Sequence, residues 1–128
     1  MIIRTGIDLV EVHRLAGVDT RIRARFLKRV YTPGELKICA DSNEKLAGRF
    51  AVKEAVSKAL GTGIGPISWQ DVETLDGAMG EPLLNLTGKA KMFAEMLGLE
   101  AWSVSISDSG DLVMAVAAAV GTGSIDPA

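Results

Sequence analysis

Two acidic side chains, Asp8 and Glu54, are not explained by simple exposure to water. Asp8 falls in an apolar, β-branched segment near the start of the chain, and Glu54 falls on a charged face of a long helical pattern. Two carboxylates without a histidine or cysteine companion suit Mg²⁺, which takes one or two protein carboxylates and completes its shell with water and phosphate oxygens. The alternative for Asp8 is a carboxylate that caps a turn.

The helical pattern around Glu54 separates apolar from polar side chains. At about 100° per residue, this pattern predicts a buried back and a polar front. The back consists of Ala51, Val52, Ala55, Val56 and Ala59, and the front consists of Arg49, Lys53, Glu54, Ser57 and Lys58. Cations on such a front suit phosphate oxygens, and arginine can bind them bidentately. The alternative is a solvated face on which Glu54 and Lys58 form an i,i+4 pair.

A glycine loop, Gly61-Thr62-Gly63-Ile64-Gly65, follows this helix directly. Alternate glycines let the backbone take positive φ and come close to a ligand. A single glycine would be interpreted as a helix C-cap. The repeated spacing indicates a phosphate site.

The elements that must position these residues predict an α+β fold, a small antiparallel sheet packed with three to four helices. Strands are expected over 2–12, 67–75, 83–86, 102–107 and 112–120, and helices over 20–30, 33–40, 44–60 and 87–97. We expect Gly6 to interrupt the first strand. The last strand is almost wholly apolar, so it should be central in the sheet or buried on both faces. We expect one domain over 1–120 and a loose tail over 121–128.

Composition narrows the class of protein. The chain has 128 residues, 48% of them hydrophobic, which is enough for one compact core. A net charge of −2 gives no global attraction to nucleic acid or membrane, and no apolar run approaches the length of a membrane span. Arg4 and Asp8 come too early for the apolar core of a signal peptide. The single cysteine, Cys39, excludes an internal disulfide framework and suits a buried position. We therefore expect a soluble, cytoplasmic protein.

The segment between His13 and Tyr31 is strongly basic within this acidic chain. Its cations are Arg14, Arg21, Arg23, Arg25, Lys28 and Arg29, opposed only by Asp19. A nucleic-acid patch is one interpretation, but only Phe26 and Tyr31 interleave as aromatic residues, which favours an acidic protein partner. His13, the only histidine, is interpreted as a surface residue.

These segments resemble the holo-acyl-carrier-protein synthase family, the short, stand-alone type of 4′-phosphopantetheinyl transferase. The resemblance begins at Gly6-Ile7-Asp8-Leu9-Val10-Glu11 and includes Arg25-Phe26 with Arg29, Thr32 and Glu35. It is strongest over Gly48-Arg49-Phe50-Ala51-Val52-Lys53-Glu54-Ala55 and Ser57-Lys58-Ala59-Leu60-Gly61-Thr62-Gly63-Ile64-Gly65. It continues through Trp69-Gln70-Asp71-Val72-Glu73, Gly80-Glu81-Pro82 and Ser105-Ile106-Ser107, and so spans nearly the whole chain.

The resemblance implies an enzyme that transfers 4′-phosphopantetheine from coenzyme A to a serine of an apo acyl carrier protein and releases 3′,5′-ADP. Asp8 and Glu54 would hold Mg²⁺, and Lys58 would complete the catalytic group. Either Glu54 itself or a water on the metal would remove the serine proton. The coenzyme would be bound by Arg49, Lys53, Lys58, Gly61, Thr62, Gly63, Gly65 and Ser107.

The same resemblance implies partners. An acidic carrier protein would dock on Arg14, Arg21, Arg25, Phe26 and Arg29, and the enzyme would be a homotrimer with active sites between neighbours. Asp108 departs from the family, because many relatives carry histidine there, and the turn at 40–43 lacks the basic residues of some relatives. We expect weak coenzyme A binding or a different local geometry. The alternative function is a catalytically silent module that binds coenzyme A or carrier protein.

Overall fold

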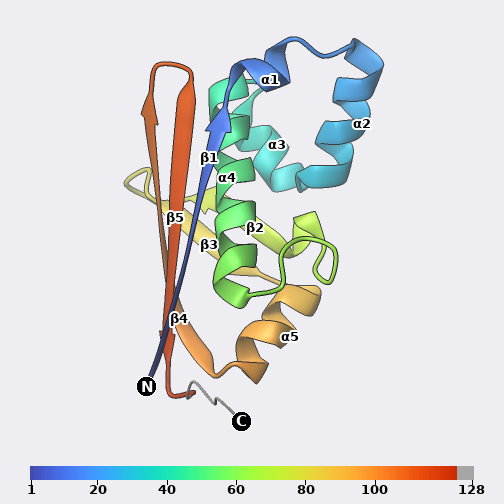
Figure 1. The fold of residues 1–128 in the computed structure, drawn as a ribbon. Helices are drawn as coiled ribbons and strands as arrows, with labels where there is room; N and C mark the ends of the chain where they lie inside the picture. Colours follow the sequence, from blue (N-terminus) through green and yellow to red (C-terminus); the bar gives the residue numbers. More distant parts are fainter. Residues whose placement is uncertain (124–128) are drawn as a thin grey trace.

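The computed structural model describes residues 1–123 and contains two antiparallel sheets and five α-helices within that range (Figure 1). The larger sheet has the strand order β1-β5-β4, formed by β1 (Ile2–Glu11), β5 (Leu112–Gly121) and β4 (Leu99–Ser109). The smaller sheet is the hairpin of β2 (Val72–Asp76) and β3 (Pro82–Leu86). The predicted α+β class is confirmed.

Strand β5 is central in the larger sheet, as its apolar sequence predicts. Gly6 does not interrupt β1, because it pairs in register with Ala117 of β5. The inner face of β5 is buried and made of small side chains, Val113, Ala115, Ala117 and Ala119. Its outer face leaves Met114 and Val116 each 41% exposed, so β5 is buried on one face within this chain.

Helix α4 (Asn43–Leu60) lies against the inner face of the larger sheet (Figure 1). Ser42 caps its first turn by accepting from Lys45 N, and Gly61 ends it with φ 78°. A row of alanines at i,i+4 spacing, Ala47, Ala51, Ala55 and Ala59, is fully buried. Such small side chains allow the helix to approach the strands closely.

Three shorter helices cover one end of α4: α1 (His13–Ala16), α2 (Thr20–Val30) and α3 (Pro33–Cys39) (Figure 1). The bounds of α2 agree with the prediction, and α3 begins at a Thr32–Glu35 capping box. The single turn α1 was not predicted. Cys39 is fully buried as predicted, and burial raises the pKa of its thiol.

The strand predicted over 67–75 is wrong in its first half. Ser68 and Asp71 form a capping box around the 3₁₀ turn η1 (Trp69–Asp71), and β2 begins only after it. The fourth predicted helix is α5 (Gly88–Met96). Part of the predicted loose tail is ordered, because Gly121 belongs to β5 and Gly123 N donates to Gly98 O at 3.2 Å. The rest, 124–128, lies outside the described residues.

Candidate active site

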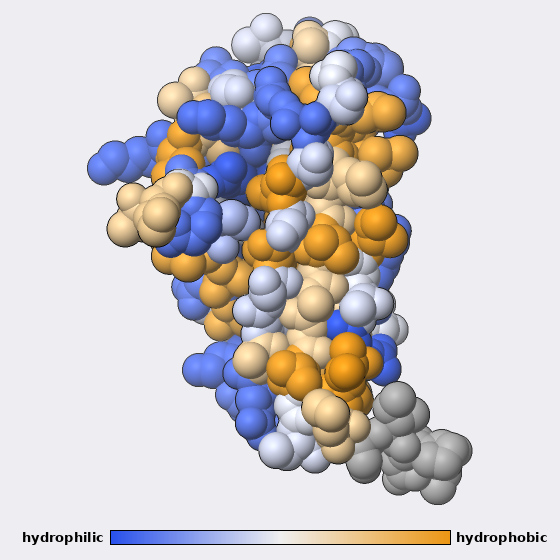
Figure 2. Space-filling view, turned by 90° about the vertical axis from the view of Figure 1, so that its left-hand side faces the viewer, coloured by the Kyte–Doolittle hydropathy of each residue, from blue (hydrophilic) through white to orange (hydrophobic). Residues whose placement is uncertain are grey.

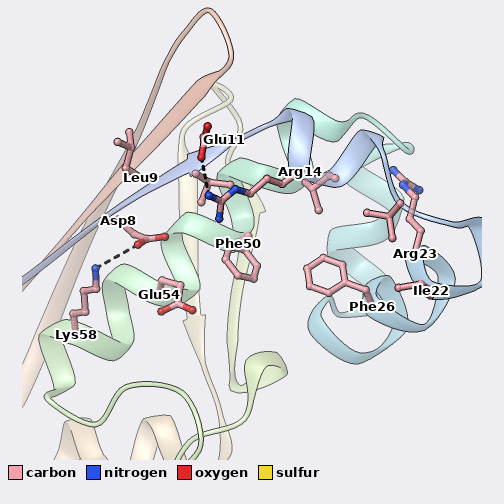
Figure 3. A pocket seen from close by; sticks show the side chains of 13 residues that line it. Asp8, Leu9, Glu11, Arg14, Ile22, Arg23, Phe26, Phe50, Glu54 and Lys58 are labelled. Atoms are coloured by element: carbon pink, nitrogen blue, oxygen red, sulfur yellow. Dashed lines mark hydrogen bonds and ion pairs between the residues drawn. The ribbon is translucent and has the colours of Figure 1, made fainter.

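A hollow of about 620 Å³ opens between the end of β1, α1, α2 and one face of α4. Asp8, Glu54 and Lys58 line one end of it, as Figure 3 shows. Asp8 projects from the inner face of β1, because it is two residues after Gly6 and alternates with exposed Ile7 and Leu9. The two carboxylates singled out by the sequence therefore face the same space.

The charges at this end of the hollow act on one another. Partial burial, followed by the negative charge of Asp8, raises the pKa of the Glu54 carboxyl, and the Lys58 ammonium opposes the shift. Lys58 Nζ donates to Ile7 O at 2.9 Å and to Asp8 Oδ1 at 3.3 Å. Two close carboxylates with one half-exposed ammonium leave excess negative charge. The donor set, two hard oxygen ligands, fits a divalent cation such as Mg²⁺.

The face of α4 that points into the hollow differs from the predicted polar front. Phe50, Glu54 and Lys58 are spaced at i,i+4 and all line the hollow. Arg49 directly precedes Phe50 and Lys53 directly precedes Glu54, so both lie about 100° around the helix from the hollow. On that side α3 and β2 cover them. The helix is buried on most sides, so the division into an apolar back and a polar front is wrong.

Lys53 is not available to a phosphate, contrary to the sequence-based interpretation. Its side chain is 0% exposed, and its Nζ donates to Glu35 Oε1 at 2.7 Å, Val72 O at 2.5 Å and Trp69 O at 3.0 Å. Glu35 also accepts from the backbone N–H groups of Thr32 and Thr74. Burial lowers the pKa of the Lys53 ammonium, and the Glu35 carboxylate opposes this shift. Lys53 thus joins α3, α4 and β2 inside the core.

Arg49 lines a second, smaller hollow of about 240 Å³ rather than the first. Its guanidinium donates to Asp76 Oδ1 at 2.5 Å, and its Nε has no hydrogen-bond partner among residues 1–123. Asp108 lines the same hollow together with Glu44. A shared hydrogen bond, followed by the charge of Asp108, raises the pKa of the Glu44 carboxyl. Asp108, which stands where many relatives carry histidine, therefore places a second acid beside Glu44.

The glycine loop closes α4 instead of presenting free amides. Gly61 N donates to Lys58 O, and the N–H groups of Thr62 and Gly63 both reach Ser57 O. Gly65 N donates to Ile67 O at 3.1 Å. These four amides are already used, and the loop lines neither of the two hollows described above. The prediction of a phosphate cradle made by these amides is not supported within one chain.

Ser107 lies on the outer face of the larger sheet, whereas Asp8 projects from the inner face. It pairs with Met114, which pairs in turn with Leu9 of β1, so two strand spacings separate β4 from β1. Ser107 is exposed. A single chain does not bring it to the hollow that contains Asp8 and Glu54.

The outer face of the sheet carries exposed apolar side chains. Ile3, Ile7 and Leu9 of β1 are 61%, 55% and 58% exposed, and they neighbour Val120, Val116 and Met114 of β5. Figure 2 shows hydrophobic residues running down this side of the molecule. We call these six residues the outer apolar face.

The basic segment is divided between the hollow and the surface. Arg14 and Phe26 line the first hollow, whereas Arg21, Arg25 and Arg29 are exposed on α2. Arg23, which the sequence grouped with them, is tied to Asp41 at 2.7 Å and to Asn43 at 2.6 Å. His13 is exposed as predicted and bonds Asp111 of the β4–β5 turn, which raises the pKa of its imidazole.

Sequence reasoning missed two residues that shape the site. Phe50 forms the wall beside Glu54 and stacks on Trp69 with ring centroids 4.9 Å apart. Its i,i+4 spacing from Glu54 could have shown that the two side chains lie on the same face of α4. Glu35 is fully buried beneath α4, and its place in a capping box gave no sign that it also binds Lys53.

The chain is similar to known proteins over most of its length. Residues 4–117 match the family described as the 4′-phosphopantetheinyl transferase superfamily. The chain is 43% identical over 126 residues to a holo-[acyl-carrier-protein] synthase of Herpetosiphon aurantiacus, covering 93% of this chain and 98% of that protein. It is similar to the solved Helicobacter pylori holo-[acyl-carrier-protein] synthase in complex with coenzyme A, with TM-score 0.82, 33% identity and coverage of 91% and 99%. A coenzyme A complex from Chronobacterium ammoniagenes gives TM-score 0.80 at 30% identity, covering 95% of this chain and 99% of that one.

Proposed function

Because the chain belongs to the 4′-phosphopantetheinyl transferase superfamily, we propose that it transfers 4′-phosphopantetheine from coenzyme A to a serine hydroxyl of an apo acyl carrier protein. The serine oxygen forms a bond to the phosphorus next to pantetheine, the diphosphate bond breaks, and 3′,5′-ADP leaves. The observation that carries the proposal is the convergence of Asp8, Glu54 and Lys58 at one end of a hollow.

Asp8 and Glu54 are the residues that would hold Mg²⁺. When bound, the cation would neutralise the negative charge that develops on the leaving phosphate. Lys58 is half exposed and already bonded to Asp8, so its ammonium can turn to a phosphate oxygen without leaving the site. Glu54 has a second carboxylate oxygen that could accept the serine proton, and a water held by the cation is the alternative base.

The acceptor protein would approach over α1 and α2. Arg14 and Phe26 at the hollow, with exposed Arg25 and Arg29 on α2, present cations around an apolar side chain. An acidic carrier protein complements this surface and is drawn to it by long-range attraction. Its serine would then reach the carboxylate end of the same hollow.

The outer apolar face supports the proposal of a homotrimer with active sites between neighbours. Contiguous exposed apolar residues on a sheet are typical of a subunit interface. A neighbour seated there would also bury the sheet edge near Ser107. Val116→Asp should convert the assembly to monomers in light scattering coupled to size exclusion; an unchanged mass would contradict an interface at this face.

The transfer is tested by incubating the protein with coenzyme A, Mg²⁺ and an apo carrier protein and weighing the carrier by mass spectrometry. We expect the phosphopantetheine adduct with the wild type and with Lys91→Met, a control exposed on α5. Asp8→Asn and Glu54→Gln should each slow the reaction by at least about 100-fold. Binding of coenzyme A without any adduct would instead support the silent module, which the acidic pair Glu44–Asp108 favours.

A further inference from the structure

Gly6 brings the backbone of β1 into direct contact with the backbone of α4. A Cβ at Gly6 would lie 1.8 Å from Ala55 O and 2.9 Å from Ala59 N, whereas real Cβ atoms keep at least 3.0 Å from such neighbours. The φ of Gly6 is not among the positive values of the chain. Glycine is therefore required at this position for space rather than for backbone conformation.

This contact lies beside the two carboxylates of the site. Asp8 is two residues after Gly6 on the same face of β1, and Glu54 directly precedes Ala55 on α4. Lys58 bridges the same two elements by donating to Ile7 O and Asp8 Oδ1. The distance between β1 and α4 at Gly6 therefore determines how far apart Asp8 and Glu54 lie.

The atoms of α4 directly against Gly6 are backbone atoms of Ala55 and Ala59, two members of the buried alanine row. If Gly6 carried a methyl group, Ala55 O would have to retreat from 1.8 Å to at least 3.0 Å, a shift of about 1.2 Å. Asp8 and Glu54 would separate by a comparable amount, because each is within two residues of the contact.

We infer that Gly6 is a positioning residue that fixes the span between Asp8 and Glu54, and thereby selects a small divalent cation over a large one; this rests on the proposed function. Metal–oxygen distances are about 2.0–2.1 Å for Mg²⁺ and about 2.3–2.6 Å for Ca²⁺. Across two ligands on opposite sides of the ion, the larger ion needs roughly 0.4–1.2 Å more room. The shift forced by a methyl group at Gly6 is of this size.

The test is competition for bound Mn²⁺, followed by electron paramagnetic resonance, with Mg²⁺ and Ca²⁺ as competitors. In Gly6→Ala, the affinity for Mg²⁺ should fall at least about tenfold relative to that for Ca²⁺. Gly121→Ala is the matched control, because its Cβ would lie 1.8 Å from Gly98 O at the other end of the sheet. We expect Gly121→Ala to keep the wild-type ratio of the two affinities.

A longer carboxylate side chain at position 8 provides a second test of the inference. Glutamate at position 8 adds one methylene and should restore Mg²⁺ preference in Gly6→Ala/Asp8→Glu. In the otherwise wild-type chain Asp8→Glu should weaken Mn²⁺ binding about tenfold, because the span is fixed; this arm does not depend on the folding of Gly6→Ala. Unchanged cation ratios in Gly6→Ala, or undiminished Mn²⁺ binding in Asp8→Glu, overturn the inference. A wild type that transfers no phosphopantetheine overturns the proposed function instead.

Discussion

Replacing Lys53 by methionine removes an ammonium that α3, α4, η1 and β2 share in the core. The side chain of Lys53 is 0% exposed, and its three acceptors are Glu35 Oε1, Trp69 O and Val72 O. Methionine preserves most of the length and volume but donates no hydrogen bond. The Glu35 carboxylate, also 0% exposed, then stays buried with only the N–H groups of Thr32 and Thr74 as donors.

The expected loss of unfolding free energy is about 3–5 kcal/mol, which is typical when one partner of a buried ion pair is removed. The native state of a domain is stable by only about 5–15 kcal/mol. Lys53→Met should therefore lower the urea midpoint strongly, and at the low end of that range the variant would be only partly folded. Lys58→Met is the matched control, because Lys58 is 53% exposed and an exposed pair is worth about 0–1 kcal/mol.

Urea titration followed by tryptophan fluorescence measures both variants, and steady-state kinetics on the folded fraction measure the Michaelis constant for coenzyme A. We expect that constant to be unchanged in Lys53→Met. A stability loss below about 1 kcal/mol, combined with a raised Michaelis constant for coenzyme A, would refute this reasoning. Lys53 would then bind phosphate, as the sequence first indicated.

Three further predictions concern the surface and the second hollow. Arg25→Glu should raise the Michaelis constant for carrier protein about tenfold at low salt and less at high salt, with coenzyme A unaffected; equal changes for both substrates would exclude a docking role. Asp108→His should lower the Michaelis constant for coenzyme A by up to about fivefold, the range of an exposed ion pair, and no change would place the coenzyme elsewhere. The imidazole of His13 should titrate by NMR above its usual range, because Asp111 raises its pKa, and Asp111→Asn should remove the shift. The stability from this pair is present below the unfolded pKa and lost as pH rises through the folded pKa; a normal pKa in the wild type would contradict the contact.

Local sequence signals located most of the elements because their causes are local. The Thr32-Pro33-Gly34-Glu35 capping box fixes the start of α3, and Ser42 and Gly61 bound α4 almost where the pattern indicated. The error at η1 has a local cause too, since the Ser68–Asp71 box outweighs the β-branched residues around it. Asp8 and Glu54 were identified from their residue type and setting, because exposure to water did not explain an acid at either position.

Helical periodicity could not show which polar residues of α4 face a hollow and which face another element. Lys53 and Glu54 are adjacent and both charged, yet the ammonium of Lys53 is enclosed by Glu35 and two carbonyls while Glu54 opens into the site. That difference depends on α3 and β2, which pack from elsewhere in the sequence. The loop at Gly61 failed as a phosphate site for a local reason instead, because its first amides bond the carbonyls of Ser57 and Lys58 and so cap α4.

The sequence by itself determined most of the elements, the apolar character of β5 and the two carboxylates, since capping, alternation and composition act over a few residues. Only the tertiary structure decided that Asp8 and Glu54 face one hollow and that Lys53 and Arg49 do not face it. The physical reason is that these contacts depend on how closely β1 approaches α4 at Gly6 and on what covers each side of the helix. Both are properties of packing between segments distant along the chain.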